Sequence, residues 1–393
     1  MKILMIAPQP FFTPRGTPFS VLYRLYALSK LGHHVDLVTY HIGRDVPIKN
    51  VSIKRIPAIP FVKSIRIGPS KIKILLDFFI LLKTVQLLLQ GSYDVIHSHE
   101  EAGFFSTWLA KIFGIKHLYD MHSSLPQQLN NFKFTTSKLL IHSFEMLEKE
   151  TLKNADGVIT ICPALFDYVE GLFPEKNQVL IENVVDNSWV LESGNETVSS
   201  LMQRYGLKND LKILYTGTFE PYQGIDLLIE SAKEVVKHHS EVTFLLVGGD
   251  PKQISHYRQQ VDEACLGGQV IFTGQVWPNL IPLFIELSDI LVSPRIEGNN
   301  TPLKIYSYLR SGKPIVATDH PTHTQVLNDQ IAVLTKRTPE SFSGGIIKLI
   351  NNSKLRKEIS RKALDMATAE YSFEGYLSKT KKIYESLEIK AGN

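Results

Sequence analysis

The sequence contains little cysteine and no strong excess of charge of either sign. The chain has 393 residues but only two cysteines, Cys162 and Cys265, which lie far apart and match no metal-binding or redox motif. This fits a protein of a reducing compartment. The formal net charge of +4 is too small to predict nucleic-acid binding, although it is compatible with an anionic ligand or an anionic membrane surface.

The sequence also lacks an apolar run that would predict a membrane-spanning helix or a signal peptide. The longest apolar segment, 72–90, is interrupted by Lys73, Asp77 and Lys83, and charges at the centre of a bilayer are costly. We therefore predict that this segment is a helix packed on a sheet. The apolar N-terminus stops at Pro8, too early for the core of a signal peptide.

Short apolar strands alternate with amphipathic helices along the whole chain, which is typical of parallel α/β sheets. The expected strands are 2–7, 35–40, 51–56, 94–99, 116–120, 157–161 and 178–182, then 211–215, 243–247, 270–273, 290–293, 315–318 and 332–334. A polar stretch, 186–200, is the predicted linker. We predict two doubly wound, Rossmann-like domains that face a cleft, 1–190 and 191–372, with a C-terminal helix in 373–393 that packs back on the first domain.

Neither a GxGxxG fingerprint nor a Walker A motif is present, which argues against dinucleotide oxidoreductases and P-loop enzymes. Candidate binding residues lie instead at the carboxyl ends of the expected strands, where ligands of parallel sheets bind. In the first half, Arg15 and Gly16 follow the first strand, and glycine would let the backbone approach a phosphate or sugar closely. His99 and Glu100 end a later strand, and the exposed glutamate is expected to touch a polar substrate.

The histidines of the first half allow more than one interpretation. His97 and His99 alternate along a strand and two glutamates follow, but the HExxH pattern of a helical metal site is absent. We expect hydrogen-bonded histidines and no metal. His122 sits just past the end of the next strand, where it would either contact a substrate hydroxyl or serve as a buried structural histidine.

Residues 293–319, SPRIEGNNTPLKIYSYLRSGKPIVATD, are the most informative part of the second half. Thr301 and Pro302 are suited to the N-cap and first position of a helix, with Lys304 in its first turn. Free backbone N–H groups, the positive end of the helix dipole and the lysine favour an anion such as a nucleotide diphosphate. An ordinary strand–helix–strand unit with a surface lysine fits the same local pattern.

Several separated segments resemble the retaining family-4 glycosyltransferases, which have the GT-B fold. The segments are 94–99 (DVIHSH), His122, 181–186 (IENVVD), 217–224 and 293–319. The resemblance implies transfer of a sugar from a nucleotide diphosphate to a hydroxyl acceptor, with retention of the anomeric configuration and without a metal or other cofactor. It makes His122 the histidine beside the reacting sugar.

The chain departs from the family pattern at its phosphate and ribose ligands. Thr218 and Gln223 stand where the family has a phosphate-binding arginine and lysine, and Ser307 stands where it has the second glutamate of E-x7-E. Glu297 lies two residues before the position of the first glutamate, which is Asn299. We infer a divergent site rather than a degraded one, in which Lys304, with Arg295 and Arg15, supplies the missing positive charge.

The resemblance and the strand-end pattern together define the expected site. The residues expected to be catalytic are His122 and Lys304. Those expected to bind the donor are Gly16, Gly217, Thr218, Gln223, Arg295, Glu297, Asn300, Thr301, Pro302, Leu303 and Ser307. Arg15, His99 and Glu100 are expected on the acceptor side.

Residues 54–73 mix six cations with apolar side chains, which predicts either docking on an anionic membrane or a solvated loop. The expected location is cytoplasmic and, with docking, peripheral on the inner face of the membrane. The expected acceptor is a saccharide or a lipid-linked molecule of polysaccharide or glycolipid assembly. Two alternatives remain. One is a GT-B nucleotide-sugar 2-epimerase that uses Glu100 and Glu101, and the other is a non-catalytic nucleotide-sugar or glycan-binding protein.

Overall fold

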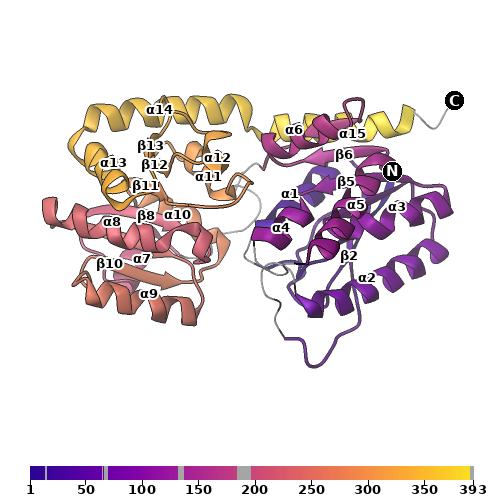
Figure 1. Ribbon diagram of the computed structural model, residues 1–393, viewed down its shortest axis with the longest axis horizontal. Helices are drawn as coiled ribbons and strands as arrows, with labels where there is room; N and C mark the ends of the chain where they lie inside the picture. Colours follow the sequence, from indigo (N-terminus) through magenta and orange to yellow (C-terminus); the bar gives the residue numbers. More distant parts are fainter. Residues whose placement is uncertain (14–15, 64, 66–69, 132–136, 184–195, 390–393) are drawn as a thin grey trace. The chain divides into compact units, whose positions relative to one another are not determined.

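The computed structural model describes residues 1–13, 16–63, 65, 70–131, 137–183 and 196–389. The chain divides into two compact units. Unit 1 is Met1–Asn183 with Glu374–Asn393, and unit 2 is Val184–Phe373 (Figure 1). The C-terminal helix, which follows all of unit 2 in sequence, therefore belongs to unit 1.

Unit 1 is built on a parallel sheet with the strand order β3-β2-β1-β4-β5-β6-β7. Its strands are β1 (Lys2–Ala7), β2 (His34–Thr39), β3 (Val51–Arg55), β4 (Val95–His99), β5 (Lys116–Met121), β6 (Gly157–Thr160) and β7 (Gln178–Leu180). Its helices are α1 (Gly16–Lys30), α2 (Lys71–Gln90), α3 (Ala102–Phe113), α4 (Leu125–Asn131), α5 (Lys138–Asn154), α6 (Pro163–Leu172) and α15 (Phe373–Ile389), the last from Glu374 on. The strand order reverses between β1 and β4, so the loops after these two strands flank the crevice where doubly wound sheets bind ligands.

Unit 2 repeats this plan with the parallel order β10-β9-β8-β11-β12-β13. Its strands are β8 (Leu211–Thr216), β9 (Val242–Val247), β10 (Val270–Gly274), β11 (Ile290–Ser293), β12 (Ile315–Thr318) and β13 (Val333–Thr335). Its helices are α7 (Val198–Arg204), η1 (Pro221–Gln223), α8 (Ile225–His238), α9 (Pro251–Glu263), η2 (Pro278–Leu280), α10 (Ile281–Glu286), α11 (Leu303–Arg310), α12 (Pro321–Thr324), α13 (Pro339–Asn351) and α14 (Ser353–Glu370). Here the order reverses between β8 and β11.

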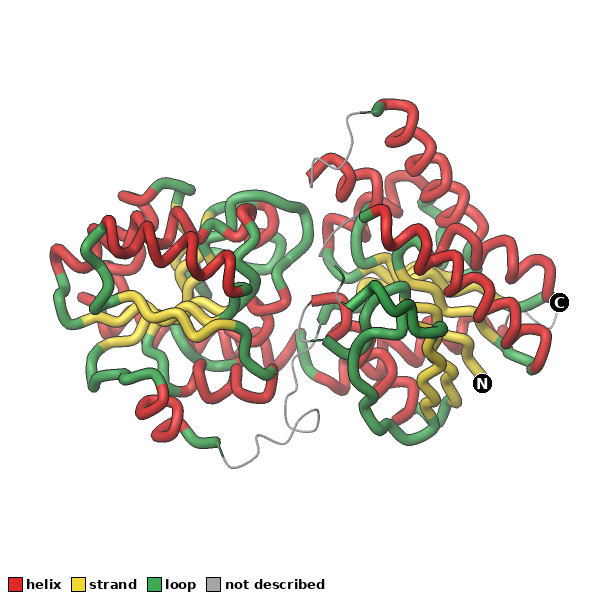
Figure 2. The backbone as a smooth tube through the Cα atoms, turned by 90° about the horizontal axis from the view of Figure 1, so that it is seen from below, coloured by secondary structure: helices red, strands yellow, loops and turns green. Residues whose placement is uncertain are grey.

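In both units the strands are nearly continuous apolar runs because helices cover the two faces of each sheet. Figure 2 shows the strands of each unit with helices on either side. In unit 1, Leu4 and Ile6 of β1 pack with Leu76 and Ile80 of α2 in one apolar core. In unit 2, Ile213 and Leu214 are neighbours in β8 but belong to different apolar cores, as expected when successive side chains point to opposite faces.

The predicted fold class of two doubly wound parallel sheets is confirmed. Two local predictions are wrong. Thr301 is not the N-cap of α11, because Pro302 takes that position with extended dihedral angles and the helix begins at Leu303. The polar stretch does not run unstructured to Ser200 either, since Thr197 and Ser200 form a capping box at the start of α7.

The apolar segment 72–90 forms α2, as predicted, but only one side of this helix is buried. Leu76, Ile80 and Leu88 face the core, whereas Phe78 is 54% exposed and Leu89 is 72% exposed. Within the described ranges, none of the helices is both long and apolar enough to cross a membrane.

Candidate functional site

In unit 1, two neighbouring strands place three histidines and one carboxylate on the same face of the sheet. His97 and His99 are two residues apart in β4, so their side chains point to the same side. In the parallel register His99 lies opposite Asp120 of β5, and His122 follows two residues later at the carboxyl end of that strand. All four side chains are buried.

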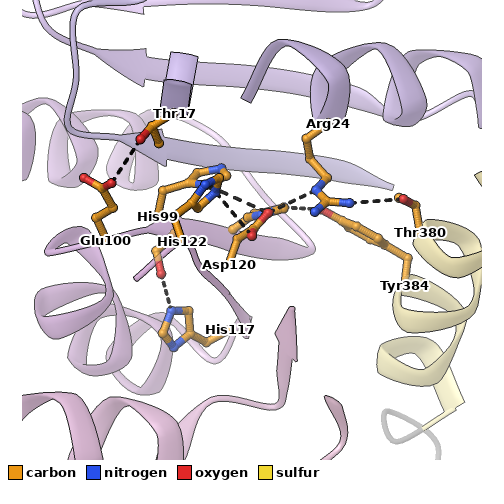
Figure 3. Close-up of polar contacts among 11 residues, drawn as sticks. Thr17, Arg24, His99, Glu100, His117, Asp120, His122, Thr380 and Tyr384 are labelled. Atoms are coloured by element: carbon orange, nitrogen blue, oxygen red, sulfur yellow. Dashed lines mark hydrogen bonds and ion pairs between the residues drawn. The ribbon is translucent and has the colours of Figure 1, made fainter. Parts of the chain in front are cut away.

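Asp120 lies at the centre of this cluster (Figure 3). Its Oδ2 atom accepts a hydrogen bond from Arg24 Nε at 3.0 Å and lies 3.3 Å from Nε2 of His97. Its Oδ1 atom lies 3.3 Å from Nε2 of His122, and that same nitrogen is 2.9 Å from Nδ1 of His99. One carboxylate therefore contacts an arginine and two histidines, and the third histidine is one contact away.

Helices α1 and α15 close the cluster from outside the sheet. Arg24 comes from α1, and its Nη1 atom lies 3.2 Å from the Thr380 hydroxyl of α15. Tyr384, also on α15, places its hydroxyl 2.6 Å from Nδ1 of His97. Figure 3 shows both α15 side chains directed at the cluster. The C-terminal helix therefore supplies hydrogen-bonding groups to the strand ends of unit 1.

Burial and charge set the protonation of these groups. Burial alone would raise the pKa of the Asp120 carboxyl, but the charge of Arg24 and the contacts from His122 and His97 outweigh it and hold that pKa well below its usual range. Burial lowers the pKa of His97, and it holds the pKa of His99 well below the ordinary histidine value. Near neutral pH, Asp120 is thus an anion paired with Arg24, while His97 and His99 are neutral.

His97, His99 and Asp120 each offer a ligand atom, and these atoms lie within 4.8 Å of one another, which is close enough to hold a metal ion. The Arg24 guanidinium already lies 3.0 Å from Oδ2 of Asp120, and its positive charge would repel a divalent cation bound there. Both nitrogens of His97 are also within hydrogen-bond distance of other groups. The donor set therefore fits a hydrogen-bonded cluster better than a metal centre.

Glu100 lies at the turn after β4 with a positive φ of 49°, and its Oε1 atom is 3.4 Å from the Thr17 hydroxyl of α1. Glu101 follows at the start of α3, where burial raises its pKa to about 8, and its Oε1 atom lies 3.9 Å from Lys73 Nζ of α2. Asp77 accepts a hydrogen bond of 2.5 Å from the Tyr40 hydroxyl, and burial raises the pKa of this carboxyl to about 6. Glu100 and Glu101 thus directly follow the strand that carries His97 and His99, whereas Asp77 contacts the residue that follows β2.

In unit 2, glycines let the loops after β8, β9 and β11 come together. A Cβ atom on Gly248 would lie 1.8 Å from the carbonyl oxygen of Gly217, and one on Gly224 would lie 2.1 Å from that of Pro294. Both glycines also have positive φ values, 132° and 74°. No other residue type would fit at these close approaches. The loops after β8 and β11 therefore meet at the point where the strand order reverses.

Lys304, in the first turn of α11, points toward these loops. Its ammonium nitrogen lies 3.7 Å from the centroid of the Tyr215 ring and 3.4 Å from Oε1 of Gln223. A Cβ atom on Gly217 would come within 3.2 Å of it. Burial and the nearby charge of Arg295 hold the pKa of Lys304 well below its usual value. Lys304 is in none of the ion pairs found within the described ranges, so no carboxylate there neutralises its charge.

Helix α11 is held in place by buried polar contacts. The Tyr308 hydroxyl accepts from the backbone N–H of Thr216 at 3.0 Å, which ties α11 to the end of β8. His323 joins the ends of β11 and β12, since its Nε2 atom is 2.8 Å from the Ser293 hydroxyl and its Nδ1 atom donates to the Thr318 carbonyl at 2.9 Å. At the N-terminus of α11, the Thr301 hydroxyl is buried and has no hydrogen-bond partner within the described ranges.

The remaining predicted residues of unit 2 lie in the loop that leads to α11 or one turn along it. Arg295 donates to the Glu297 carbonyl at 2.8 Å, and its guanidinium lies 5.1 Å from the centroid of the Tyr222 ring. Glu297 itself is exposed, Asn300 is half-buried, and Ser307 is half-buried on α11. Thr218 uses its backbone carbonyl to accept from the Tyr215 hydroxyl at 2.7 Å.

The structure thus brings together two groups of predicted residues. In unit 1, His99, Glu100 and His122 lie at adjacent strand ends, and Gly16 is the exposed first residue of α1. In unit 2, Gly217 and Gln223 surround Lys304. Arg15 lies outside the described residues.

Sequence reasoning missed Arg24, Tyr215 and Tyr384. Arg24 is a buried charge in the middle of an otherwise apolar helix face, a signal that could have marked it. Nothing in the sequence indicates that Tyr384 reaches His97, because the two residues are 287 positions apart.

Two family models match the chain, one on each side of the polar stretch. Residues 199–366 match the family described as glycosyl transferases group 1, and residues 15–189 match glycosyltransferase family 4. The first match contains Gly217 and Lys304, and the second contains His99 and His122.

Curated proteins of similar sequence include three glycosyltransferases. An uncharacterized glycosyltransferase of Methanocaldococcus jannaschii is 23% identical over 93% of this chain and 97% of its own length. The alpha-monoglucosyldiacylglycerol synthase of Streptococcus pneumoniae is 22% identical over 89% of this chain and 78% of its own length. The phosphatidyl-myo-inositol mannosyltransferase of Mycobacterium tuberculosis is 24% identical over 98% of this chain and 97% of its own length.

Solved structures share the fold over nearly the full chain. The sucrose-phosphate synthase of Thermosynechococcus elongatus has a TM-score of 0.78 at 18% identity, with 99% of each chain covered. Anabaena HepE, solved in complex with UDP-glucose, has a TM-score of 0.74 at 17% identity, again with 99% of each chain covered. With both halves matched by glycosyltransferase models and two Rossmann-like domains of the GT-B fold, the chain belongs to the glycosyltransferases of the group 1 and family 4 type.

Proposed function

We propose that this glycosyltransferase moves a sugar from a nucleotide-diphosphate donor to an acceptor hydroxyl, with retention of the anomeric configuration and without a metal ion. The observation that carries the proposal is the position of Lys304. It is a half-buried cation in the first turn of α11, beside the point of strand reversal in unit 2, and no carboxylate of the described ranges pairs with it. A site with unneutralised positive charge, backbone N–H groups and a buried hydroxyl donor suits a diphosphate.

The leaving diphosphate gains charge as the glycosidic bond breaks, and the groups of unit 2 would stabilise that charge. The Lys304 ammonium and the N-terminal N–H groups of α11 are the main contributors. The buried hydroxyl of Thr301, which has no partner among the described residues, can donate one further hydrogen bond. Gln223 replaces the family's lysine with a neutral amide, so more of the electrostatic stabilisation depends on Lys304. Arg295 adds a second cation whose charge already acts on Lys304.

In unit 1, His122 is proposed to contact the reacting sugar. Its position at the carboxyl end of β5, the strand next to β4, suits a polar group that orients a hydroxyl or steadies developing positive charge. We assign no protein nucleophile, because an oxygen of the donor diphosphate can take the proton of the incoming hydroxyl. His99 and Glu100 lie at the neighbouring strand end and are proposed on the acceptor side.

The acceptor is proposed to be a saccharide or a lipid-linked molecule, reached from an anionic membrane surface. Two relatives are named for activity on diacylglycerol and phosphatidylinositol lipids. Unit 1 presents exposed apolar side chains on and before α2, including Phe61, which is 73% exposed, and Phe78. Lys63 and Lys71 are exposed beside them. Apolar and basic groups mixed in this way favour binding in the headgroup region of anionic lipids, with the protein peripheral on the cytoplasmic face.

A panel of nucleotide sugars tests the donor proposal. Nucleoside diphosphate release that depends on an added acceptor is expected, and NMR of the product should show the donor's anomeric configuration. Activity should also survive a chelator. Release with a free epimerised sugar would instead indicate an epimerase, and binding without turnover would indicate a non-catalytic binding protein.

A Lys304→Gln variant tests the site. Loss of a charge-assisted contact to the leaving group is expected to lower kcat by about 10²–10³-fold. Lys313→Gln is the matched control, because Lys313 lies just past the same helix and its Nζ atom donates to the Glu286 carbonyl at 3.0 Å. Equal activity of the Lys304 variant and this control would refute the assignment.

A further inference from the structure

The three histidines of the unit 1 cluster are grouped around one carboxylate, that of Asp120. We propose that Asp120 is a positioning residue that sets the tautomers of His122, His99 and His97, and that Tyr384 of α15 completes the arrangement. The proposal rests on the proposed function in so far as His122 is taken to face the sugar. Its core, the tautomers themselves, can be measured without any substrate.

The first arm of the network runs from Asp120 through His122 to His99. Asp120 is ionised, so its oxygens can only accept hydrogen bonds. Nε2 of His122 lies 3.3 Å from Oδ1 of Asp120, and an anionic oxygen at that distance attracts an N–H and repels a lone pair. Nε2 of His122 therefore carries the proton. It donates to Nδ1 of His99 at 2.9 Å, so the proton of neutral His99 is on Nε2.

The second arm runs from Asp120 through His97 to α15. Nε2 of His97 lies 3.3 Å from Oδ2 of Asp120 and must donate to it. Neutral His97 then has an unprotonated Nδ1, which accepts from the Tyr384 hydroxyl at 2.6 Å. The pKa of Tyr384 is held well above 10 by its burial, which keeps the hydroxyl proton in place. All three histidines are thus protonated on Nε2.

Arg24 distinguishes the two oxygens of the Asp120 carboxylate. It donates to the same Oδ2 atom that accepts from His97, so two donors converge on one carboxylate oxygen. In an Asp120→Asn variant the amide oxygen would take the place that faces these two donors. The amide NH₂ would then face Nε2 of His122 and require a lone pair there. His122 would switch to the Nδ1–H form, and His99 would become the donor to it.

The switch matters for chemistry because it reverses the hydrogen-bonding character of the second nitrogen of His122. With the ring proton on Nε2, Nδ1 of His122 is an acceptor in the wild type, and with the proton on Nδ1 it is a donor in the Asp120 variant. An isosteric change that imposes the wrong tautomer on a catalytic histidine leaves the geometry intact but lowers turnover strongly. Asp120 therefore acts on the reaction through His122 rather than by touching the substrate.

The test is ¹⁵N NMR of the full chain labelled at histidine, with signals assigned by single His→Gln variants. In the wild type, His97, His99 and His122 should each show a protonated Nε2 and an unprotonated Nδ1. In Asp120→Asn, His122 and His99 should switch to Nδ1–H while His97 keeps its form. His117, on the opposite face of the sheet and 2.7 Å from Ser98 through Nε2, is the internal reference whose signals should not change.

Steady-state kinetics provide the second measurement. Asp120→Asn is expected to lower kcat by on the order of 10²-fold, with KM for the donor nearly unchanged. Asp156→Asn is the matched control, since it makes the same change where the carboxylate accepts from the backbone N–H of His117 at 2.9 Å, at the other end of β5. This control is expected to leave kcat unchanged. Tyr384→Phe, which keeps the ring but removes the donor to His97, should shift the His97 Nδ1 signal and lower kcat by about threefold to tenfold.

Each measurement can contradict the proposal separately. A wild-type His122 protonated on Nδ1 would overturn it without any variant, so it does not depend on whether Asp120→Asn folds. Unchanged tautomers and kcat in Asp120→Asn would also overturn it, as would an unchanged His97 Nδ1 signal and kcat in Tyr384→Phe. If no nucleotide sugar is turned over, the proposed function fails while the NMR result still decides the proton arrangement.

Discussion

The ammonium nitrogen of Lys304 lies 3.7 Å from the centroid of the Tyr215 ring, so an aromatic face rather than a carboxylate adjoins it. The quadrupole of the ring attracts the cation, but a ring stabilises an ammonium less than an anion does. Burial correspondingly holds the pKa of Lys304 well below its usual value. A diphosphate that binds there would supply the missing negative charge.

Donor binding is therefore expected to take up a proton at Lys304. The free protein has a lowered lysine pKa, and a bound anion raises it again, so between these two values binding adds a proton and affinity falls as pH rises. Calorimetric titration of the best-binding nucleoside diphosphate at pH 8, in buffers of different ionisation enthalpy, measures this uptake. In Lys304→Arg the guanidinium is always charged, and proton uptake should vanish. Buffer-independent enthalpies for the wild type would show the prediction to be wrong.

Gly217→Ala is expected to weaken donor binding by displacing Lys304. The new Cβ would lie 3.1 Å from the Tyr215 hydroxyl and 3.2 Å from the lysine nitrogen, in a backbone with φ of 143° that other residues rarely adopt. We expect at least about a tenfold loss of donor affinity and a loss of about 1–2 kcal/mol in the free energy of unfolding. Gly344→Ala is the control, because this glycine of α13 has no neighbour within 4 Å, and alanine there should stabilise the helix slightly. Wild-type donor affinity in Gly217→Ala would mean that the new methyl group does not displace Lys304.

His323 should make the stability of the protein fall as pH is lowered below neutrality. Burial lowers the pKa of this histidine to about 3, so below the ordinary value near 6.5 the unfolded chain binds a proton that the folded chain does not. Stability is then fully present above about pH 6.5 and declines by about 1.4 kcal/mol per pH unit toward the folded pKa.

Urea unfolding at pH 7.5 and pH 5.5 compares the wild type with His323→Gln. The variant should lose some stability at both pH values, because the contacts to Ser293 and Thr318 change, but its pH dependence should be smaller by about 1.4 kcal/mol. His238→Gln, at the exposed end of α8, removes a histidine without altering the interior. If the stability of His323→Gln retains the wild-type pH dependence, then His323 is not buried in its neutral form.

The protein is expected to sediment with anionic liposomes at low salt and to be released as salt is raised. The double variant Phe61→Ser and Phe78→Ser removes two exposed apolar side chains of unit 1 and should reduce binding by at least about tenfold, since full burial of one aromatic side chain contributes about 1.5–3 kcal/mol. Trp277→Ser is the control, because this tryptophan is 44% exposed on unit 2. Equal sedimentation of all variants, or none for the wild type, would count against membrane docking by this surface.

The sheets could be predicted from the sequence because parallel strands buried on both faces are continuous apolar runs. The predicted strands 2–7, 290–293 and 315–318 coincide with β1, β11 and β12, and the other strand boundaries differ by at most two residues. Lys304 was also predictable as a candidate, since a lysine in the first turn of a helix after a strand indicates an anion site from local sequence alone.

The contacts of the site could not be predicted in the same way. Arg24, Asp120 and Tyr384 come from three distant segments, and only the fold places them around His97. The error at Thr301 has a local reason. Its hydroxyl was expected to cap α11, but Pro302 occupies the cap position, so the hydroxyl remains buried and unpaired within the described ranges.

The membership of α15 in unit 1 affects how the protein is made. Arg24 and His97 emerge from the ribosome hundreds of residues before Thr380 and Tyr384, the two groups that they contact. During synthesis, unit 1 therefore lacks the Thr380 contact of Arg24 and the Tyr384 contact of His97 until unit 2 has been translated. A nascent chain halted after unit 2 would contain every strand of both sheets and still lack the last hydrogen bonds of its histidine cluster.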